Sequence, residues 1–138
     1  MSGTERAGRT RRDSEDRGVA SGRLPRLLLP AEGVALCLAA LAVYIDRDYS
    51  LLLALVLFLA PDLSFAGYAA GPRIGSYTYN AFHTSIGPLV LGAVGVVADR
   101  RLAIALALVW LAHIGADRAL GYGLKYPSAF RDTHLQRV

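Results

Sequence analysis

The chain has 138 residues, of which 54% are hydrophobic, and its formal net charge is +4. Its mean hydropathy of +0.36 is too high for an ordinary small soluble domain, and its apolar residues come in runs long enough to cross a bilayer. The composition therefore predicts a single polytopic membrane domain. Cys37 is the only cysteine, which excludes an intrachain disulfide, and we expect its thiol to pack among apolar neighbours.

Residues 1–24 form a basic leader that we expect to be a disordered cytoplasmic tail. The first 26 residues contain seven arginines interleaved with four acids, and they have too few apolar side chains to build a core. The interleaved acids argue against nucleic acid as a partner. The positive charge is better suited to orienting the chain in a membrane.

Residues 25–138 contain four apolar runs, which predict transmembrane helices at about 27–45, 51–70, 77–98 and 102–122 and a short interfacial segment at the C-terminus. The connections are short, so neighbouring helices should be antiparallel. The expected fold class is an all-α bundle of four transmembrane helices. Pro61 and Pro88 each remove a helical hydrogen bond, so the second and third helices should bend beside them.

The distribution of Lys and Arg predicts the orientation of the bundle. With both termini in the cytoplasm, eleven basic residues would lie inside, and only Arg47, Arg100 and Arg101 would lie outside. We therefore expect a multi-pass protein of the cell (inner) membrane, with membrane lipids as its immediate partners.

Two histidines and two aspartates fall inside the apolar runs: Asp62, His83, His113 and Asp117. Counting the helical rise puts Asp62 and His113 each about 17 Å from the outer face, and His83 at a similar level. His113 and Asp117 are four residues apart and share one helix face. Ionisable groups at this depth usually face a polar interior, so we expect a small polar cavity among the second, third and fourth helices.

Two His and two Asp side chains form a plausible ligand set for one divalent metal ion, Zn²⁺ or Mn²⁺. Such an ion could polarise a phosphoryl or acyl oxygen and lower the pKa of a bound water toward about 7. Asp117, or Asp62 if it is not a ligand, would then act as the general base. The alternative is that these groups only make hydrogen bonds between helices.

Three other polar residues lie in or beside the apolar runs. Asn80 is the nearest polar residue before His83, on the same predicted helix. Glu32 and Arg118 each lie about one to two turns from the inner face, where a structural ion pair or snorkelling is expected. Trp110 is most simply explained by packing or by lipid contact.

Two features concern the ends of helices. Gly67, Gly71 and Gly75 suggest close packing or the end of the second helix. After the fourth helix, Gly121 and Gly123 permit a tight return of the chain, which could cap the cavity. The alternative is a plain interfacial tail anchored by Tyr and Lys side chains.

The motifs carry a resemblance to a known family. They are Pro61-Asp62-Leu63-Ser64-Phe65, Gly71-Pro72-Arg73, Tyr79-Asn80 with His83, Gly87-Pro88, and Trp110 to Asp117-Arg118, continuing through Tyr126. Over about residues 27–135 the chain resembles small bacterial membrane proteins known as domain of unknown function 4260. The resemblance implies an integral membrane protein and no particular activity.

A weaker similarity implies chemistry. The order of the motifs is similar to that of membrane-bound metal-dependent hydrolases, and it maps onto Asp62, His83 with Ser85, and His113 with Asp117. Ser64 stands where a second acid is typical, and the His-Arg element before the central His is missing. These departures argue against a two-metal site and leave one metal ion or none.

Two classes of function remain open on the sequence. The leading hypothesis is an intramembrane metal-dependent hydrolase acting on a lipid-like substrate. The competing class is a non-enzymatic membrane protein, either a small transporter subunit with a His/Asp proton relay or an assembly bundle. Four spans are few for a transporter, so that version would require a homo-oligomer.

Overall fold

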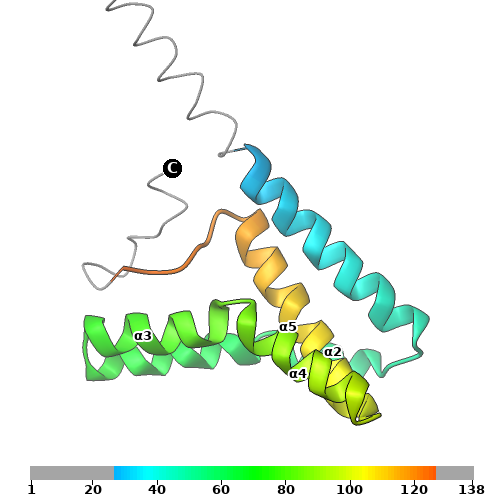
Figure 1. Cartoon of the computed structure of the whole chain (residues 1–138). Coiled ribbons are helices and arrows are strands. Elements are labelled where there is room, and N and C mark those ends of the chain that lie inside the picture. Colours follow the sequence, from blue (N-terminus) through cyan, green and yellow to red (C-terminus); the bar gives the residue numbers. More distant parts are fainter. Residues whose placement is uncertain (1–26, 127–138) are drawn as a thin grey trace, which may run out of the picture.

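A computed structural model describes residues 27–126 (Figure 1); the expected tail at residues 1–24 and the stretch 127–138 lie outside the described part. The chain is all-α, and four of its helical spans are long and apolar enough to cross a membrane, as predicted. The first is the helix Leu27–Asp46. The second joins α2 (Leu51–Leu57) to the 3-10 helix η1 (Ala60–Ala70), the third joins α3 (Pro72–His83) to α4 (Ile86–Val97), and the fourth is α5 (Arg101–Ala119).

The second and third spans are each broken close to a proline. Pro61 occupies the first turn of η1, where its missing N–H is no loss. Thr84 is extended, with φ −81° and ψ 143°, and separates α3 from α4. Pro88 has no N–H for the carbonyl of Thr84, so a continuous helix would leave that carbonyl unpaired. The predicted bends are confirmed.

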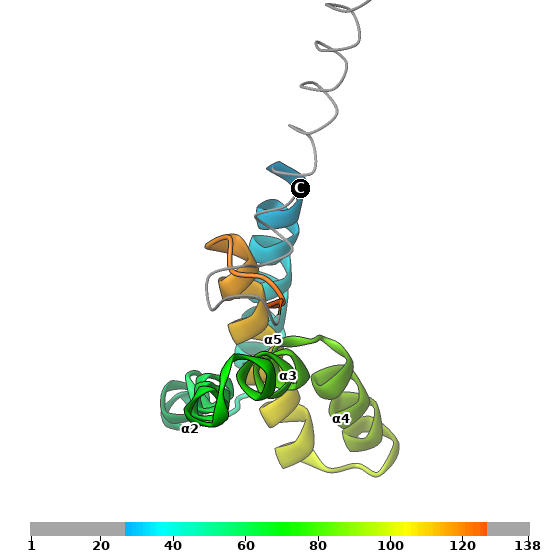
Figure 2. The ribbon, with the colours of Figure 1, turned by 90° about the vertical axis from the view of Figure 1, so that its left-hand side faces the viewer.

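The helices pack as two antiparallel pairs plus the first helix. η1 lies against α3, and α4 lies against α5. The pair of α2–η1 and α3 crosses α5 at a steep angle (Figure 1), and in Figure 2 α2 and α4 are seen on either side of α3. The guanidinium Nη2 of Arg101 donates a hydrogen bond of 3.0 Å to the carbonyl of Arg47. The two turns that contain Arg47 and Arg100 therefore lie at the same end of the bundle.

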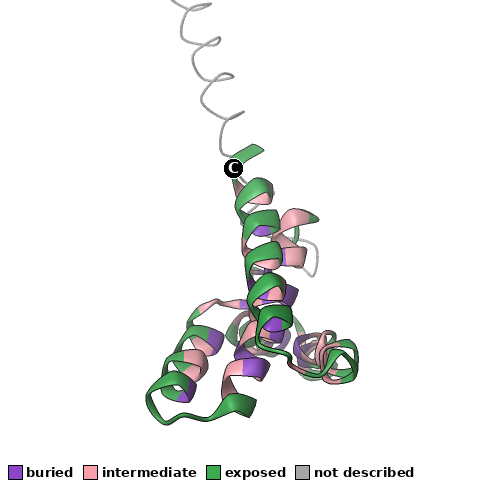
Figure 3. Cartoon of the chain, turned by 90° about the vertical axis from the view of Figure 1, so that its right-hand side faces the viewer, coloured by how far each residue is buried: buried purple, intermediate pink, exposed green. Residues whose placement is uncertain are grey.

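α5 is the central helix. In its most apolar stretch 39% of the residues are buried, against 17% or less in the other three spans. Figure 3 shows exposed positions along the outer sides of the helices, with the buried positions where helices meet. Large apolar side chains on the other spans point outward, such as Leu55 at 77% exposure and Val97 at 88%. An apolar outer surface over a small buried core is the pattern expected of a chain surrounded by lipid.

The first helix crosses α5 at two glycines. A Cβ on Gly33 would lie 2.7 Å from the carbonyl oxygen of Gly115, and a Cβ on Gly115 would lie 2.6 Å from the backbone nitrogen of Cys37. Only glycine fits at this crossing, which is the close small-residue packing common between membrane helices. The predicted close packing at Gly67 and Gly75 is also present, against the side chains of Thr78 and Tyr68.

Two helix ends differ from the sequence prediction. α3 begins at Pro72 rather than near residue 77, because Gly71, at φ +107°, makes the turn and Pro72 suits the first helical position. α5 ends at Ala119 rather than near residue 122, because Gly121 adopts φ +84° and its N–H bonds back to the carbonyl of Arg118.

Candidate metal centre

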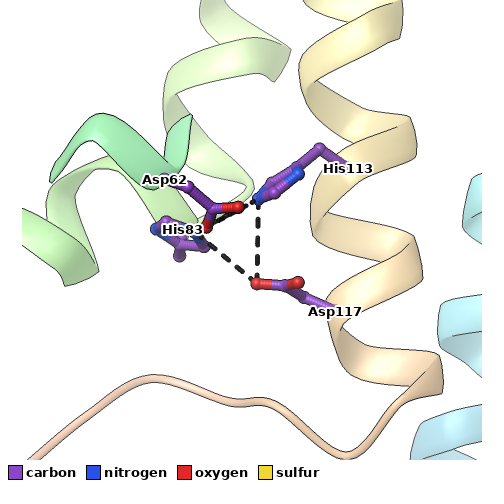
Figure 4. Close-up of side chains that lie close together, drawn as sticks. All are labelled: Asp62, His83, His113 and Asp117. Atoms are coloured by element: carbon purple, nitrogen blue, oxygen red, sulfur yellow. Dashed lines mark hydrogen bonds and ion pairs between the residues drawn. The ribbon is translucent and has the colours of Figure 1, made fainter. Parts of the chain in front are cut away.

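Asp62, His83, His113 and Asp117 converge on one point between the two helix pairs (Figure 4). Asp62 comes from the first turn of η1, His83 is the last residue of α3, and His113 and Asp117 lie on one face of α5. Each side chain offers one nitrogen or oxygen atom, and these four atoms all lie within 4.8 Å of one another. Both histidines are buried, and both aspartates are partly exposed.

The four spacings between histidine nitrogens and carboxylate oxygens are close to those of a tetrahedral site. Ligands that sit 2.0 to 2.2 Å from one tetrahedral ion are separated from each other by about 3.3 to 3.6 Å. The Nε2 atom of His83 lies 3.4 Å from Asp62 Oδ1 and 3.5 Å from Asp117 Oδ2. The Nε2 atom of His113 lies 3.5 Å and 3.8 Å from the same two oxygens. The four atoms can therefore surround a single small cation with little movement.

The end of α3 orients the ring of His83. Its Nδ1 lies 2.9 Å from the carbonyl oxygen of Tyr79, and because a carbonyl only accepts, Nδ1 carries the proton. The Nε2 lone pair is then free to face the cluster, the arrangement usual for histidines that bind metals. The ring of Tyr79 stacks on the imidazole with centroids 3.7 Å apart and fixes its plane.

His113 faces His83 directly. The two Nε2 atoms are 3.2 Å apart, and two bare lone pairs at that distance repel unless a proton or a cation lies between them. Within residues 27–126, the other ring nitrogen of His113, Nδ1, is buried and has no hydrogen-bond partner. The rings of His113 and Phe58 are nearly perpendicular, with centroids 5.4 Å apart, so an apolar neighbour at the end of α2 packs against the imidazole.

The two carboxylates have different surroundings. The hydroxyl of Tyr79 donates a hydrogen bond of 3.2 Å to Asp117 Oδ2, which fixes one oxygen of that carboxylate. The side chain of Asp117 is 20% exposed, whereas that of Asp62 is 34% exposed. Asp62 is thus the more accessible of the two carboxylates.

A segment after α5 covers one side of the cluster, and the sequence did not reveal how it is held. The side-chain amide of Asn80 donates a 2.8 Å hydrogen bond to the carbonyl of Lys125 and accepts a 2.7 Å bond from the N–H of Lys125. The chain therefore returns along α3 after Gly121. Two such bonds fix both the position and the direction of the returning backbone.

Lys125 is buried rather than an exposed interfacial anchor, with 7% of its surface exposed. Its ammonium lies 4.5 Å from the ring centroid of Phe65 and 4.6 Å from that of Tyr79, at cation–π distance. Burial lowers the pKa of Lys125, and the charges of Asp117 and Asp62 partly offset that effect. The buried ammonium therefore places a positive charge close to the two carboxylates.

A small cavity lies between the cluster and this segment. Its lining includes Tyr79, His83, Asp117 and Tyr122, and its volume is about 10 Å³. That is near the smallest space that holds one water molecule. The cavity lies among α3, α5 and the segment after α5, and no residue of the second span lines it, so the expectation of a cavity among the second, third and fourth helices holds only for the last two.

The remaining sequence candidates lie outside the cluster. Asn80 acts on the segment after α5, as described above. Among residues 27–126 no ion pair joins Glu32 to Arg118: the side chain of Glu32 points outward, although Gly33 beside it packs against Arg118. The expected ion pair is therefore not formed in this structure. Trp110 has a polar role, because its Nε1 donates a 2.6 Å hydrogen bond to the carbonyl of Phe82.

Comparison with known proteins places the chain in a family. No curated protein and no solved structure matches it. The resemblance to membrane-bound metal-dependent hydrolases gains no support from these comparisons. The model of the family described as domain of unknown function (DUF4260) matches residues 26–138, which is most of the chain. The chain belongs to the DUF4260 family.

Proposed function

We propose that this protein is an intramembrane metal-dependent hydrolase that holds one divalent cation between His83, His113 and the two aspartates. The observation that supports this most directly is the tetrahedral spacing of two imidazole nitrogens and two carboxylate oxygens. Four electron-pair donors turned toward one point favour a cation there. Zn²⁺ or Mn²⁺ suits a mixed set of imidazole and carboxylate ligands.

The residues around the cation divide into two roles in this proposal. His83, His113 and Asp117 hold the ion, and Tyr79 orients both His83 and Asp117 through its carbonyl and hydroxyl groups. The ion would act as a Lewis acid on an acyl or phosphoryl oxygen. Asp62, the more exposed carboxylate, would leave the fourth ligand position when substrate binds there, and would then accept a proton from the attacking water.

A catalytic site needs such a replaceable ligand, because a closed four-ligand site is typical of structural metals. The greater exposure of Asp62 is what supports this division of roles. The water-sized cavity beside His83 and Asp117 supplies room for the attacking molecule.

We also propose that the protein resides in the inner membrane of the cell with both termini in the cytoplasm. The excess of Lys and Arg at one end supports this orientation. Cysteine labelling at Arg47→Cys and Arg100→Cys, in a Cys37→Ala background, should react with an impermeant reagent only from outside. Labelling of either turn only from the cytoplasm would reverse the orientation.

A His/Asp proton relay is the second candidate. The 3.2 Å separation of the two Nε2 atoms favours it, because one shared proton would satisfy both rings without a metal. In this reading the carboxylates would take up and release the proton, and the protein would be a transporter subunit rather than an enzyme.

Metal analysis of the purified full-length chain separates the two candidates. We expect about one equivalent of Zn or Mn per chain, and loss of that metal in His83→Ala, His113→Ala and Asp117→Asn. Glu32→Gln is the matched control, since it removes a carboxylate from a span outside the cluster and should leave the metal content unchanged.

Asp62→Asn tests the division of roles. It should keep most of the metal while abolishing hydrolysis of a glycerol monoester or a lysophospholipid. A folded wild-type protein that binds no divalent metal would overturn the hydrolase proposal and favour the relay.

A further inference from the structure

An apolar pocket of about 270 Å³ lies among the second span, α3, α4 and α5, and two of the residues that line it are chain neighbours of Asp62 and His83. Leu57 and Pro61 line it from the second span, Phe82 from the end of α3, and Leu106, Val109 and Trp110 from α5. Every residue that lines it is apolar or aromatic. The one polar hydrogen among these side chains, on Nε1 of Trp110, is already donated to the carbonyl of Phe82.

The pocket and the metal centre share their supporting backbone. Pro61 precedes Asp62, and Phe82 precedes His83. On α5, Val109 lies one helical turn before His113, so the two share one face. A molecule lying in this pocket would therefore have its end next to the ligand atoms.

We propose that this pocket binds the hydrocarbon chain of a single-chain amphiphile, whose polar linkage then lies at Asp62 and the two histidines. This inference rests on the proposed function and assigns its substrate class. The pocket opens within membrane-spanning segments, where the surrounding medium is itself hydrocarbon. Its volume of about 270 Å³ lies just below the usual range of ligand pockets, about 300 to 1,000 Å³, so it suits one hydrocarbon chain better than two.

The packing around Trp110 keeps this pocket in shape. A Cβ on Gly87 of α4 would lie 2.8 Å from the indole Cη2, so only glycine leaves room for the ring. The hydrogen bond to Phe82 fixes the other end of the indole. Trp110 is therefore a rigid wall of the pocket rather than a side chain free to fill it.

Trp110 is the only tryptophan in the chain, so its fluorescence reports on the pocket alone. The test uses full-length protein in phosphatidylcholine vesicles and a glycerol monoester brominated on its acyl chain, since bromine quenches indole on contact. We expect quenching that saturates at a low mole fraction of the probe. The unbrominated monoester should reverse it, and glycerol alone should not.

Variants that fill the pocket provide the decisive comparison. Ala60→Phe and Leu106→Phe act from different helices, and each should weaken the apparent affinity about tenfold or more, since each 1.4 kcal/mol of lost contact is tenfold. Ala66→Phe is the matched control: Ala66 is an exposed alanine on η1 that does not line the pocket. It should bind the probe as the wild type does.

The outcomes separate this inference from the proposed hydrolase function. Quenching that rises in proportion to the mole fraction of the probe would mean contact with bulk lipid and would overturn the pocket assignment. Equal quenching in Ala60→Phe, Leu106→Phe and Ala66→Phe would overturn it as well. Saturable quenching that also persists in His113→Ala supports the chain-binding pocket independently of the metal. If the wild-type protein shows saturable quenching but binds no divalent metal, the hydrolase proposal is rejected and the chain-binding pocket is retained.

Discussion

The indole of Trp110 on α5 donates its only N–H to the carbonyl oxygen of Phe82, the residue before His83, at 2.6 Å. This carbonyl belongs to the last turn of α3, where helical carbonyls have no partner of their own. Lipid has no hydrogen-bond donor to replace the indole N–H. Without this bond the carbonyl of Phe82 would be unpaired, which is energetically costly in a membrane. Trp110 thus supports the helix end that carries His83.

Replacing Trp110 with Phe should lower the free energy of unfolding by about 1 to 3 kcal/mol, because an aromatic ring remains but the carbonyl of Phe82 loses its donor. Thermal unfolding in detergent, followed by circular dichroism, measures this. Tyr77→Phe, which removes a polar hydrogen from an exposed aromatic on α3, should change the midpoint little. Equal midpoints for the two variants would contradict the capping role.

Gly115→Ala should destabilise the protein and also reduce its metal content. The added Cβ would meet the backbone of Cys37 and Gly33, which cannot move aside cheaply, so a loss of about 1 to 3 kcal/mol is expected. Gly115 lies between His113 and Asp117, so separating the two helices also displaces ligands.

Gly92→Ala is the control for this change, because its Cβ would meet only the Cβ of Ala107, at 3.3 Å. Better helix propensity should make that variant neutral or slightly more stable. Unfolding and metal analysis on both variants would settle the matter, and similar losses in both would argue against a special role for the Gly33–Gly115 crossing.

Asn80→Leu should release the segment after α5. Both hydrogen bonds to the backbone of Lys125 are lost, and at about 1 kcal/mol each the amide of Lys125 should exchange with solvent at least fivefold faster. Asn80→Asp keeps the acceptor for that amide and loses only the donor, so its effect should be intermediate. Hydrogen exchange read by mass spectrometry gives the order, and unchanged exchange in Asn80→Leu would show that other contacts hold the segment.

The burial of Lys125 predicts a pH dependence of stability at alkaline pH. Its pKa in the folded protein is lowered from the usual 10.5, chiefly by desolvation. Between the lowered value and 10.5 the unfolded chain binds more protons than the folded one, so stability should rise with pH across that window. Below the lowered value Lys125 is protonated in both states, and its contribution stays constant.

Comparison with Lys125→Met isolates this contribution. The stability of the wild type relative to Lys125→Met should increase as the pH approaches 10.5, and chemical unfolding at a series of pH values measures the difference. A difference that falls with rising pH would mean that the ammonium is stabilised, rather than penalised, in its aromatic surroundings.

The membrane spans could be predicted because hydropathy is a local property of the sequence. The bend in the third span could be placed because Pro88 has no N–H to donate to the carbonyl of Thr84. The convergence of Asp62 with the two histidines was an expectation from membrane depth, which needs only the helical rise. Depth says nothing about rotation around a helix axis, so it could not have excluded an outward-facing His83.

The contacts that hold the site in place were beyond sequence reasoning. Asn80 and Lys125 are 45 residues apart, and no periodicity links them. Nothing in the sequence distinguishes Gly33 from other small residues. The need for glycine at this position depends on where α5 crosses the first helix. For Trp110 the sequence predicts only packing or lipid contact, because its hydrogen-bond partner is a backbone carbonyl, which every residue possesses and no sequence pattern marks.

The four side chains of the cluster are divided evenly between the two helix pairs: Asp62 and His83 belong to α2–η1 and α3, and His113 and Asp117 belong to α5, which pairs with α4. The first pair emerges from the ribosome before the second, so the complete ligand set arises only when α5 docks against η1 and α3. A cation held by all four residues would then join the last span, α5, to the second and third spans, which are synthesised before it. Such a cation would add stability to the packing of α5 against η1 and α3, over and above any part it takes in a reaction.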